Sequence, residues 1–277
     1  MISPPWEDAR RELDCWAEQG LKAAFWVRDD DAVRTSEQLA RLHELAETHD
    51  IAIGLAVIPA ELHPSLPQYV SQHRQRFYPM CHGWRHINHA RAGHRPAEFG
   101  PERPISALVD DARLAYRAFR RHFGEIDVVF VPPFGRISRA LVRALPGIGF
   151  SGLSGAAGWL ERKLLHLSDW NIRLPTIGSS RRRGVPRLDV QIDPIDWRER
   201  TACDPALISQ ALVRCLRARR NGLVASSLPI GLVTHHLDHD ESVWRTCDAI
   251  LRLLREHEAV EFLHVAQFFR GSSAVAY

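Results

Sequence analysis

Short apolar runs alternate with helical patterns along nearly the whole chain, and this alternation restricts the fold more than any other feature. The predicted strands are rich in β-branched and aromatic residues and span 23–27, 51–57, 76–81, 126–131, 150–153, 188–192, 230–235 and 260–265. Helical patterns between several of them span 36–49, 105–123, 138–145, 205–220 and 241–256. Repeated strand–helix–strand units of this kind indicate a parallel sheet with crossover helices.

The length of the chain favours one arrangement of these units. A (β/α) barrel of about 250 residues forms a single domain, and this chain has 277 residues. We therefore expect one α/β domain over residues 1–277, a (β/α) barrel with seven to eight parallel strands; an open doubly wound sheet is the alternative. The segments 88–103 and 154–186 do not fit the alternation. Because long segments in a compact domain are usually functional or mobile, we expect them as loops over the barrel mouth.

Composition argues against several classes of protein. Hydrophobic residues make up 45% of the chain and charged residues 25%, as in globular domains. The longest uncharged run, 144–160, contains five Gly and one Pro, so we expect no membrane span. The first twelve residues carry charges where a secretory signal needs an apolar stretch, which predicts a cytoplasmic protein. The five cysteines form no Cys-x-x-Cys pair, which predicts reduced thiols.

The basic residues are unusual in kind, because only Lys22 and Lys163 among the 36 are lysine. Dense arginine clusters occur at 181–183 and 217–220, without interleaved aromatic residues. This pattern favours a solvated surface over nucleic-acid binding and leaves the oligomeric state open.

Polar clusters follow five of the predicted strands, at the end where a barrel builds its active site. These clusters are residues 28–31, 82–89, 132–136, 193–197 and 234–240. Finding them at corresponding strand ends is more informative than any one cluster, because each alone has an ordinary structural explanation. The run Asp29-Asp30-Asp31, for example, is also compatible with the start of the helix predicted at 36–49.

Two histidines in these clusters have the spacing of metal ligands. His82 and His86 are four residues apart, so one helical turn would place both imidazoles on one side. Together with a carboxylate from the run 29–31 they would form a two-histidine, one-carboxylate site with open positions. Zinc suits these ligands best, and cobalt, nickel or iron can occupy the same set. Pro132 and Pro133 fix the backbone and would present the N–H groups of Phe134 and Gly135 rigidly, as an oxyanion site requires, or would simply end a strand.

Taken together, the clusters resemble the motifs of the metal-dependent polysaccharide deacetylases, carbohydrate esterase family 4, whose catalytic domain is a distorted (β/α) barrel. The family motifs are Thr-Phe-Asp-Asp, His-(Ser/Thr)-x-x-His, Arg-Pro-Pro-Tyr, Asp-x-x-Asp-Trp and Leu-x-His. Matching residues occur here in the same order between residues 28 and 236. The resemblance implies a fold of this type for most of the chain.

The first two motifs imply the base and the metal ligands. In the first, Asp30 corresponds to the catalytic base and Asp31 to a metal ligand. In the second, His82 and His86 correspond to the two metal histidines, and Gly83 replaces the Ser or Thr.

The other motifs imply the groups that surround the scissile bond. The third motif keeps Pro133 and an aromatic residue, Phe134, but Val131 stands where the family has the arginine that holds the base. Arg28 and Arg136 are the candidates to replace that arginine. The last two motifs imply that Asp196 orients the catalytic histidine, that Trp197 packs beside the site, and that this histidine is His235 or His236.

The resemblance implies a metal-dependent deacetylase that hydrolyses the N-acetyl amide of a carbohydrate or glycan precursor. A divalent ion would activate water, Asp30 would accept the proton, and the Phe134 N–H would stabilise the oxyanion. His235 or His236 would protonate the departing amine. Two alternatives remain open at this point. One is an allantoinase-like hydrolase of a non-sugar amide, and the other is an inactive, metal-bearing barrel that binds glycans.

Overall fold

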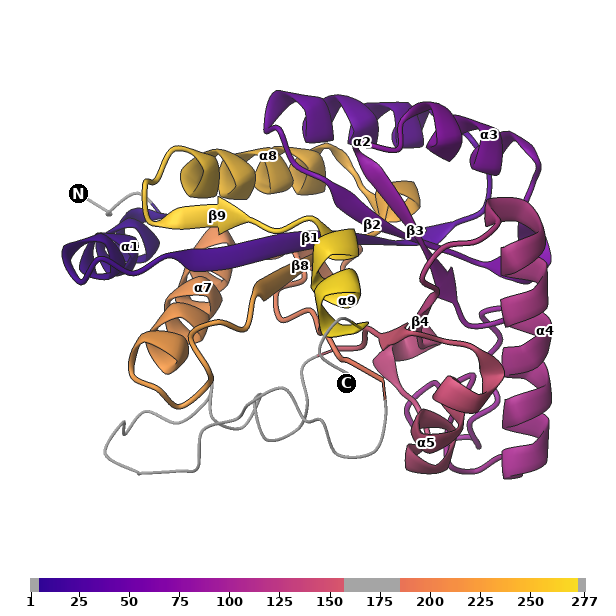
Figure 1. Cartoon of the computed structure of the whole chain (residues 1–277). Coiled ribbons are helices and arrows are strands. Elements are labelled where there is room, and N and C mark those ends of the chain that lie inside the picture. Colours follow the sequence, from indigo (N-terminus) through magenta and orange to yellow (C-terminus); the bar gives the residue numbers. More distant parts are fainter. Residues whose placement is uncertain (1–4, 157–184, 274–277) are drawn as a thin grey trace.

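A curved parallel sheet occupies the centre of the computed structural model, which describes residues 5–156 and 185–273 (Figure 1). Within these residues the main sheet has seven strands. The path β5-β4-β3-β2-β1-β8 is joined by parallel pairs throughout, and β9 pairs with the start of β1. The strands are β1 (Ala23–Ala32), β2 (Ile53–Val57), β3 (Phe77–His82), β4 (Val129–Val131), β5 (Gly152–Leu153), β8 (Ile230–Thr234) and β9 (Val260–Phe262).

The two ends of this sheet are linked by a segment without regular strand structure. Residues 187–192 make isolated parallel bridges on one side to Leu153 and Ala156 and on the other to Leu232. The strand expected at 188–192 is therefore reduced to single bridges, and the barrel closes irregularly. This is the distorted (β/α) barrel that the motifs imply.

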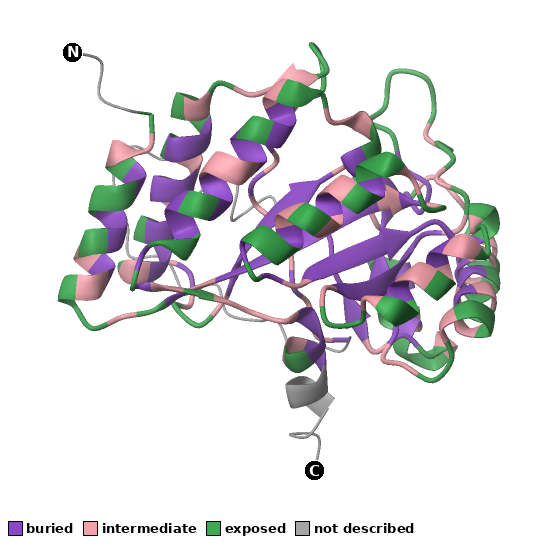
Figure 2. Cartoon of the chain, turned by 90° about the horizontal axis from the view of Figure 1, so that it is seen from above, coloured by how far each residue is buried: buried purple, intermediate pink, exposed green. Residues whose placement is uncertain are grey.

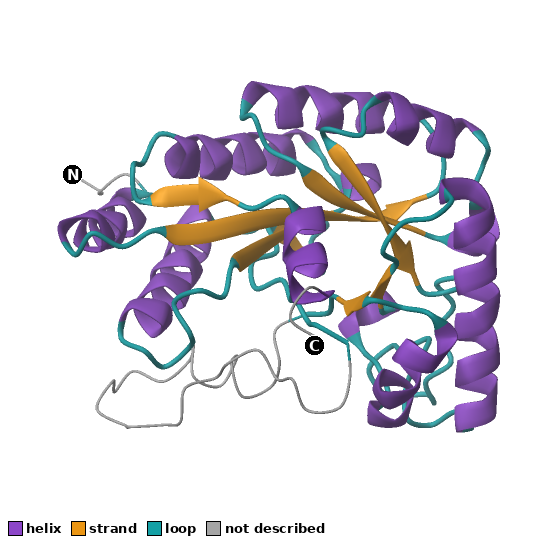
Figure 3. Ribbon diagram, viewed as in Figure 1, coloured by secondary structure: helices purple, strands orange, loops and turns teal. Residues whose placement is uncertain are grey.

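Helices lie around the sheet (Figure 3), and their exposed residues are on the faces turned away from it (Figure 2). The helices are α1 (Glu7–Glu18), α2 (Glu37–Thr48), α3 (Ser65–Gln72), α4 (Ile105–Phe123), α5 (Arg139–Ile148), α7 (Pro205–Arg220), α8 (Glu241–Arg255) and α9 (Val265–Ser273). In α4, Leu108, Ala112, Ala115 and Phe119 form one buried stripe, because residues three and four apart share a face. None of the helices in 5–156 and 185–273 is both long enough and apolar enough to cross a membrane.

Strand alternation divides the core into two parts. Phe25 and Val27 of β1 pack outward in the cluster between the sheet and its helices. Trp26 packs inward, in a second cluster that includes Met80 and Val131. Helix α9 adds Phe269 to this inner cluster. Because inner and outer residues alternate, Arg28 and Asp30 continue the inward row at the carboxyl end of β1.

Short connections at the carboxyl ends of the strands complete the mouth. They include the 3-10 turns Pro133–Gly135 and His236–Asp238 and a small antiparallel hairpin of β6 (Ile195–Asp196) and β7 (Thr201–Ala202). The expected mouth segment 88–103 contains no helix or named strand. Most of the other expected mouth segment, residues 157–184, lies outside the described residues.

Candidate metal centre and catalytic site

An irregularity at the end of β1 brings two consecutive carboxylates to the same region. Regular alternation would send Asp30 and Asp31 to opposite faces of the sheet. The register with β2 shifts between Asp29 and Ala32, and Asp31 has a φ of 70°. Such a bulge re-aims a side chain next to a site. As a result Asp31 faces His82, the last residue of β3, and His86, which follows the strand, while Asp30 stays in the inward row.

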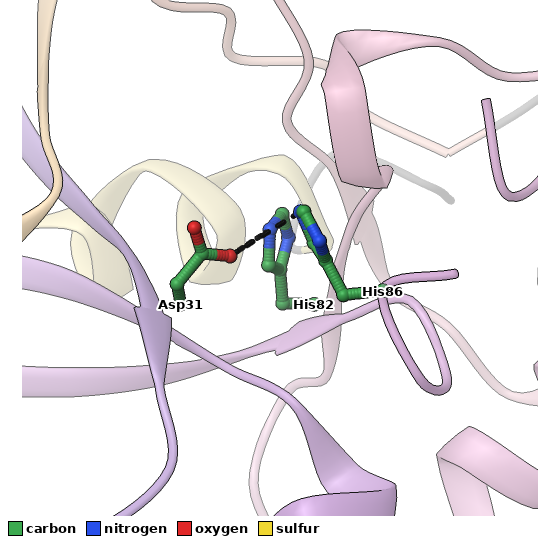
Figure 4. A group of neighbouring side chains, drawn as sticks. All are labelled: Asp31, His82 and His86. Carbon is green, nitrogen blue, oxygen red and sulfur yellow. Dashed lines mark ion pairs between the residues drawn. The ribbon is translucent and has the colours of Figure 1, made fainter. Parts of the chain in front are cut away.

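Asp31, His82 and His86 form a compact group of potential metal ligands (Figure 4). Asp31 Oδ1 lies 3.1 Å from His82 Nε2 and 3.3 Å from His86 Nε2. Ligand atoms about 2.0–2.1 Å from a tetrahedral ion are about 3.3 Å apart, so the spacing fits one ion such as zinc. Asp31 Oδ1 is buried and has no hydrogen-bond donor among the described residues, as expected of an atom that binds a cation.

The pKa directions of Asp31 and His86 favour metal binding, whereas at His82 burial is outweighed by the charges of Asp30 and Asp31, which raise its pKa. Burial by itself would raise the pKa of Asp31, but the contact with His82 and the charges of His82 and His86 outweigh it and hold the pKa well below its usual range. Burial lowers the pKa of His86, which favours the neutral imidazole that a metal requires. The Nδ1 atom of His82 lies 3.2 Å from the carbonyl oxygen of Val131. A proton on Nδ1 would satisfy this contact and leave Nε2 for the ion.

Glu98 holds the turn that carries both histidines. Its carboxylate is buried and accepts hydrogen bonds from the N–H groups of Trp84 (3.2 Å) and Arg85 (2.7 Å). Gly83 has a φ of 55°, and a Cβ atom there would lie 2.3 Å from Glu98 Oε2 and 2.4 Å from Pro133 Cγ. The glycine at the Ser/Thr position of the motif is therefore required by the packing of Glu98. Glu98 lies in the 88–103 segment, and no local signal in the sequence marks it as part of the site.

Arg28 holds Asp30 in a buried two-bond pair. Its Nε and Nη2 atoms donate to Asp30 Oδ1 (2.7 Å) and Oδ2 (2.9 Å). Its Nη1 atom donates to Ser154 Oγ (2.8 Å), and both Arg28 and Asp30 are buried. Arg136, the other candidate for this role, instead donates to the backbone oxygen of Arg95 (2.6 Å). The arginine that holds the expected base Asp30 is thus Arg28, which lies two residues earlier on β1.

The two candidate histidines of the fifth motif lie in different surroundings. His235 Nε2 is 3.9 Å from Asp30 Oδ2, and its ring packs edge-on against Trp197, with 4.6 Å between centroids. His236 is completely buried and bonds through Nδ1 and its backbone N–H to Asp29. The structure therefore brings His235, rather than His236, to Asp30.

The two aspartates of the fourth motif also differ. Asp193 Oδ2 accepts a hydrogen bond from Trp197 Nε1 (2.8 Å). Burial raises the pKa of Asp193, and the nearby charge of His235 opposes that rise. Asp196 Oδ1 instead accepts the backbone N–H of Arg198 (2.9 Å) and closes a turn. Of these two aspartates, Asp193 is thus the one whose pKa responds to the charge of His235. Neither aspartate forms a hydrogen bond with His235 Nδ1, which has no partner among the described residues, so the orienting role of Asp196 stays a prediction.

Phe134 lies beside the metal ligand His86 and has a backbone N–H without an acceptor in the described part of the chain. It has a φ of 59° and a ψ of 15°, inside the turn Pro133–Gly135, and its ring centroid lies 4.4 Å from that of His86. Among the described residues, none accepts a hydrogen bond from its N–H. Asp31, His86 and Phe134 all have a positive φ. Backbone strain of this kind tends to concentrate at functional sites.

No protein-family model and no curated protein sequence matches the chain. Solved structures do share its fold at low sequence identity. A mutant of BA3943, a carbohydrate esterase family 4 pseudoenzyme of Bacillus anthracis, with restored enzymatic activity is 13% identical, with a TM-score of 0.52 over 90% of this chain and 68% of that chain. A family 4 acetyl xylan esterase from Clostridium thermocellum, in complex with a cobalt ion, is 13% identical, with a TM-score of 0.50 over 91% and 92% of the two chains. These likenesses show that the chain has the distorted (β/α) barrel fold of the family 4 carbohydrate esterases.

Proposed function

We propose that the protein is a metal-dependent deacetylase that hydrolyses the N-acetyl amide of a carbohydrate or glycan precursor. One observation carries the proposal: the ligand group Asp31, His82 and His86 adjoins an arginine-held carboxylate, Asp30, and a histidine, His235. A metal, a general base and a general acid at one barrel mouth are the groups that amide hydrolysis needs.

Asp31, His82 and His86 would hold the divalent ion, with zinc as the best fit. When bound, the ion supplies Lewis acidity, which polarises the amide carbonyl and lowers the pKa of water. Asp30 accepts the proton of the attacking water through the carboxylate that Arg28 orients. The free N–H of Phe134 donates to the developing oxyanion, with Pro133 fixing that backbone.

His235 completes the reaction by protonating the departing amine. An amide nitrogen leaves readily near neutral pH only when it is protonated. The charges of Asp193 and His235 interact, and Trp197 packs edge-on against the His235 ring. Of the alternatives, retention of Arg28, Asp30 and His235 in contact argues against an inactive barrel. A non-sugar amide remains the competing substrate class.

Metal content and acetate release test the proposal. Elemental analysis should find about one equivalent of divalent metal in the native protein and none in the His82→Ala/His86→Ala variant. Asp30→Asn should keep the metal and reduce acetate release from N-acetylated chitooligosaccharides by about 100-fold or more. His122→Ala, an exposed histidine on α4, is the control for a histidine change away from the site.

The two histidines of the fifth motif are distinguished in the same assay. His235→Ala should retain the metal and the fold and lose turnover, because it removes the proton donor. His236→Ala should lower the melting temperature, because it leaves Asp29 buried without its partner. Native protein that binds no metal after reloading, or Asp30→Asn at full activity, would refute the proposal.

A further inference from the structure

An open hollow of about 710 Å³ adjoins the metal centre. Four arginines line it, namely Arg95, Arg136, Arg139 and Arg187, and Phe134 forms the wall nearest the metal ligands. The Phe134 ring also contacts His86, with 4.4 Å between ring centroids. A single side chain therefore separates the hollow from the proposed reaction centre. The volume is within the range of small-molecule sites.

The positive charge in the hollow is only partly neutralised. Arg187 bonds to Asp189 at 2.7 Å, and Arg136 interacts electrostatically with Glu102 without forming an ion pair. Arg95 and Arg139 are exposed, and neither forms an ion pair with any described residue. At least two guanidinium groups thus face solvent in a concave surface, where charges of one sign raise the local concentration of counter-ions.

The other lining residues argue against a neutral occupant. Among the described residues that line the hollow there is no carboxylate or amide side chain, and Phe134 is the aromatic one. A neutral sugar offers hydroxyl groups that donate as well as accept, so its sites need acceptor side chains or aromatic stacking surfaces. Guanidinium groups donate only, and they match the oxygens of phosphate or carboxylate.

We propose that this hollow binds an anionic group, a phosphate or a carboxylate, that the amide substrate carries next to its acetamido group. The inference rests on the proposed function for the reaction itself, and it narrows the substrate to an anionic N-acetylated sugar or glycan precursor. Arg95 and Arg139 are the main contributors, because their side chains are exposed and unpaired. Arg136 adds a third charge, fixed by its bond to the Arg95 backbone oxygen.

Calorimetry on metal-free protein tests binding independently of turnover and of any contact between an anion and the metal. The probes are N-acetylglucosamine 1-phosphate, N-acetylmuramic acid and methyl N-acetylglucosaminide, which carry a phosphate, a carboxylate and no charge. At least one anionic probe should bind at least tenfold more tightly than the neutral probe, since charged hydrogen bonds exceed the energy of a tenfold change. Which anion binds more tightly distinguishes a phosphorylated substrate from an acidic sugar.

The variant Arg95→Gln/Arg139→Gln should bring the ratio of anionic to neutral affinity close to one. The matched control is Arg113→Gln/Arg117→Gln, which removes two exposed arginines from α4 and changes net charge by the same amount. The control should keep the native ratio. Equal affinity of all three probes for the native protein, or equal losses in the two variants, would overturn the anion site.

Failure of this site and failure of the proposed function give different results. Acetate released from neutral and anionic substrates with equal kcat/KM would leave the deacetylase standing and overturn the anion site. Anion-selective binding that depends on Arg95 and Arg139, without acetate release from any probe by the metal-loaded protein, would leave the anion site standing and refute the deacetylase.

Discussion

Arg28 shows how a single side chain can compensate for a changed motif. The family arginine precedes the two prolines of the third motif, where this chain has Val131. Here the arginine lies two residues before Asp30 on the same strand, so both side chains point to the same side. Arg28 donates two parallel hydrogen bonds to Asp30, and both groups are buried. A charge pair of this geometry orients the carboxylate as well as stabilising it.

Removing Arg28 and placing an arginine at position 131 of β4 tests whether Arg28 replaces the family arginine. Arg28→Ala should keep the metal but lower kcat by about 100-fold, because Asp30 loses its orientation. Val131 pairs with His82 and packs in the inner cluster with Trp26. Adding Val131→Arg to Arg28→Ala should therefore return an arginine to Asp30 and recover at least tenfold in kcat.

Steady-state kinetics, metal analysis and circular dichroism measure these effects on folded protein. Val131→Arg alone is the control. We expect no increase in kcat from it, because Arg28 already bonds to both carboxylate oxygens of Asp30. Full activity of Arg28→Ala would show that Asp30 needs no arginine. Equal kcat for Arg28→Ala and the double variant would show that residue 131 cannot supply one.

At the scale of elements, the turn between His82 and His86 depends on a segment distant from it in sequence. Glu98 accepts two backbone N–H groups of this turn, and Gly83 gives its carboxylate room. Gly93 offers a matched comparison, since its φ is also positive, at 79°, and a Cβ atom there would meet nothing within 4 Å.

Substituting alanine at the two glycines should separate backbone strain from crowding. Gly93→Ala should cost about 1 kcal/mol of unfolding free energy, the price of a left-handed alanine. Gly83→Ala should cost at least twice as much, because its Cβ displaces Glu98 and Pro133, and should also weaken metal binding at least tenfold. Urea unfolding and competition with a metal chelator measure the two effects. If both variants behave alike, the contact with Glu98 does not support the site.

The difference between local signals and contacts between separate segments explains how much of the fold could be predicted from the sequence. The helix expected at 105–123 is α4 with the same bounds, because its apolar period and Gly124 are local signals. Strand β1 extends five residues beyond the expected end at Val27, because Arg28 and Asp30 satisfy each other in the barrel interior. Helices α1, α3 and α9 were not predicted. α3 has only eight residues, too few for a clear period.

For the site, motif order predicted residues that the structure brings together, including Asp31, His82 and His86. His235 and His236 follow the end of β8, and only His235 lies near Asp30. The tandem histidines alone do not show which of the two does so. The placement of Asp193 and Glu98 depends on contacts between distant segments, so their local sequence contained no sufficient signal.

At the scale of the whole molecule, hydrogen bonds on the outer side of the barrel join the carboxyl ends of β1 and β8. Asp29 accepts hydrogen bonds from Thr234 Oγ1 (2.7 Å) and from the backbone N–H of His236 (3.0 Å). Burial would lower the pKa of His236, but the charge of Asp29 outweighs it and raises that pKa. This buried pair holds β8 in register with β1 and so places His235 at the mouth.

His239 lies beside this network and must stay neutral in the folded protein. Burial lowers its pKa to about 4. Its Nε2 atom accepts the backbone N–H of His235 (3.2 Å), and its ring packs edge-on against Trp244, with 4.5 Å between centroids. Protonation of Nε2 would remove the acceptor and place a second positive charge near His236.

The sign of the resulting pH dependence follows from the depressed pKa of His239. Between pH 6.5, the ordinary value for histidine, and pH 4, the unfolded chain binds this proton and the folded protein does not. The His239 contribution to unfolding free energy is therefore fully present above pH 6.5 and is lost as the pH falls toward 4. Over the whole window the loss amounts to roughly 3 kcal/mol.

His239→Gln should flatten this part of the stability profile, because a glutamine oxygen can accept the same backbone N–H without titrating. Between pH 6.5 and 4.5, the fall in unfolding free energy should be about 2 kcal/mol smaller in His239→Gln than in the native protein. Urea unfolding across this range measures the difference, and the exposed His122→Gln serves as the control and should follow the native profile. A His239→Gln profile parallel to the native one would mean that His239 takes up its proton without opening the junction of β1 and β8.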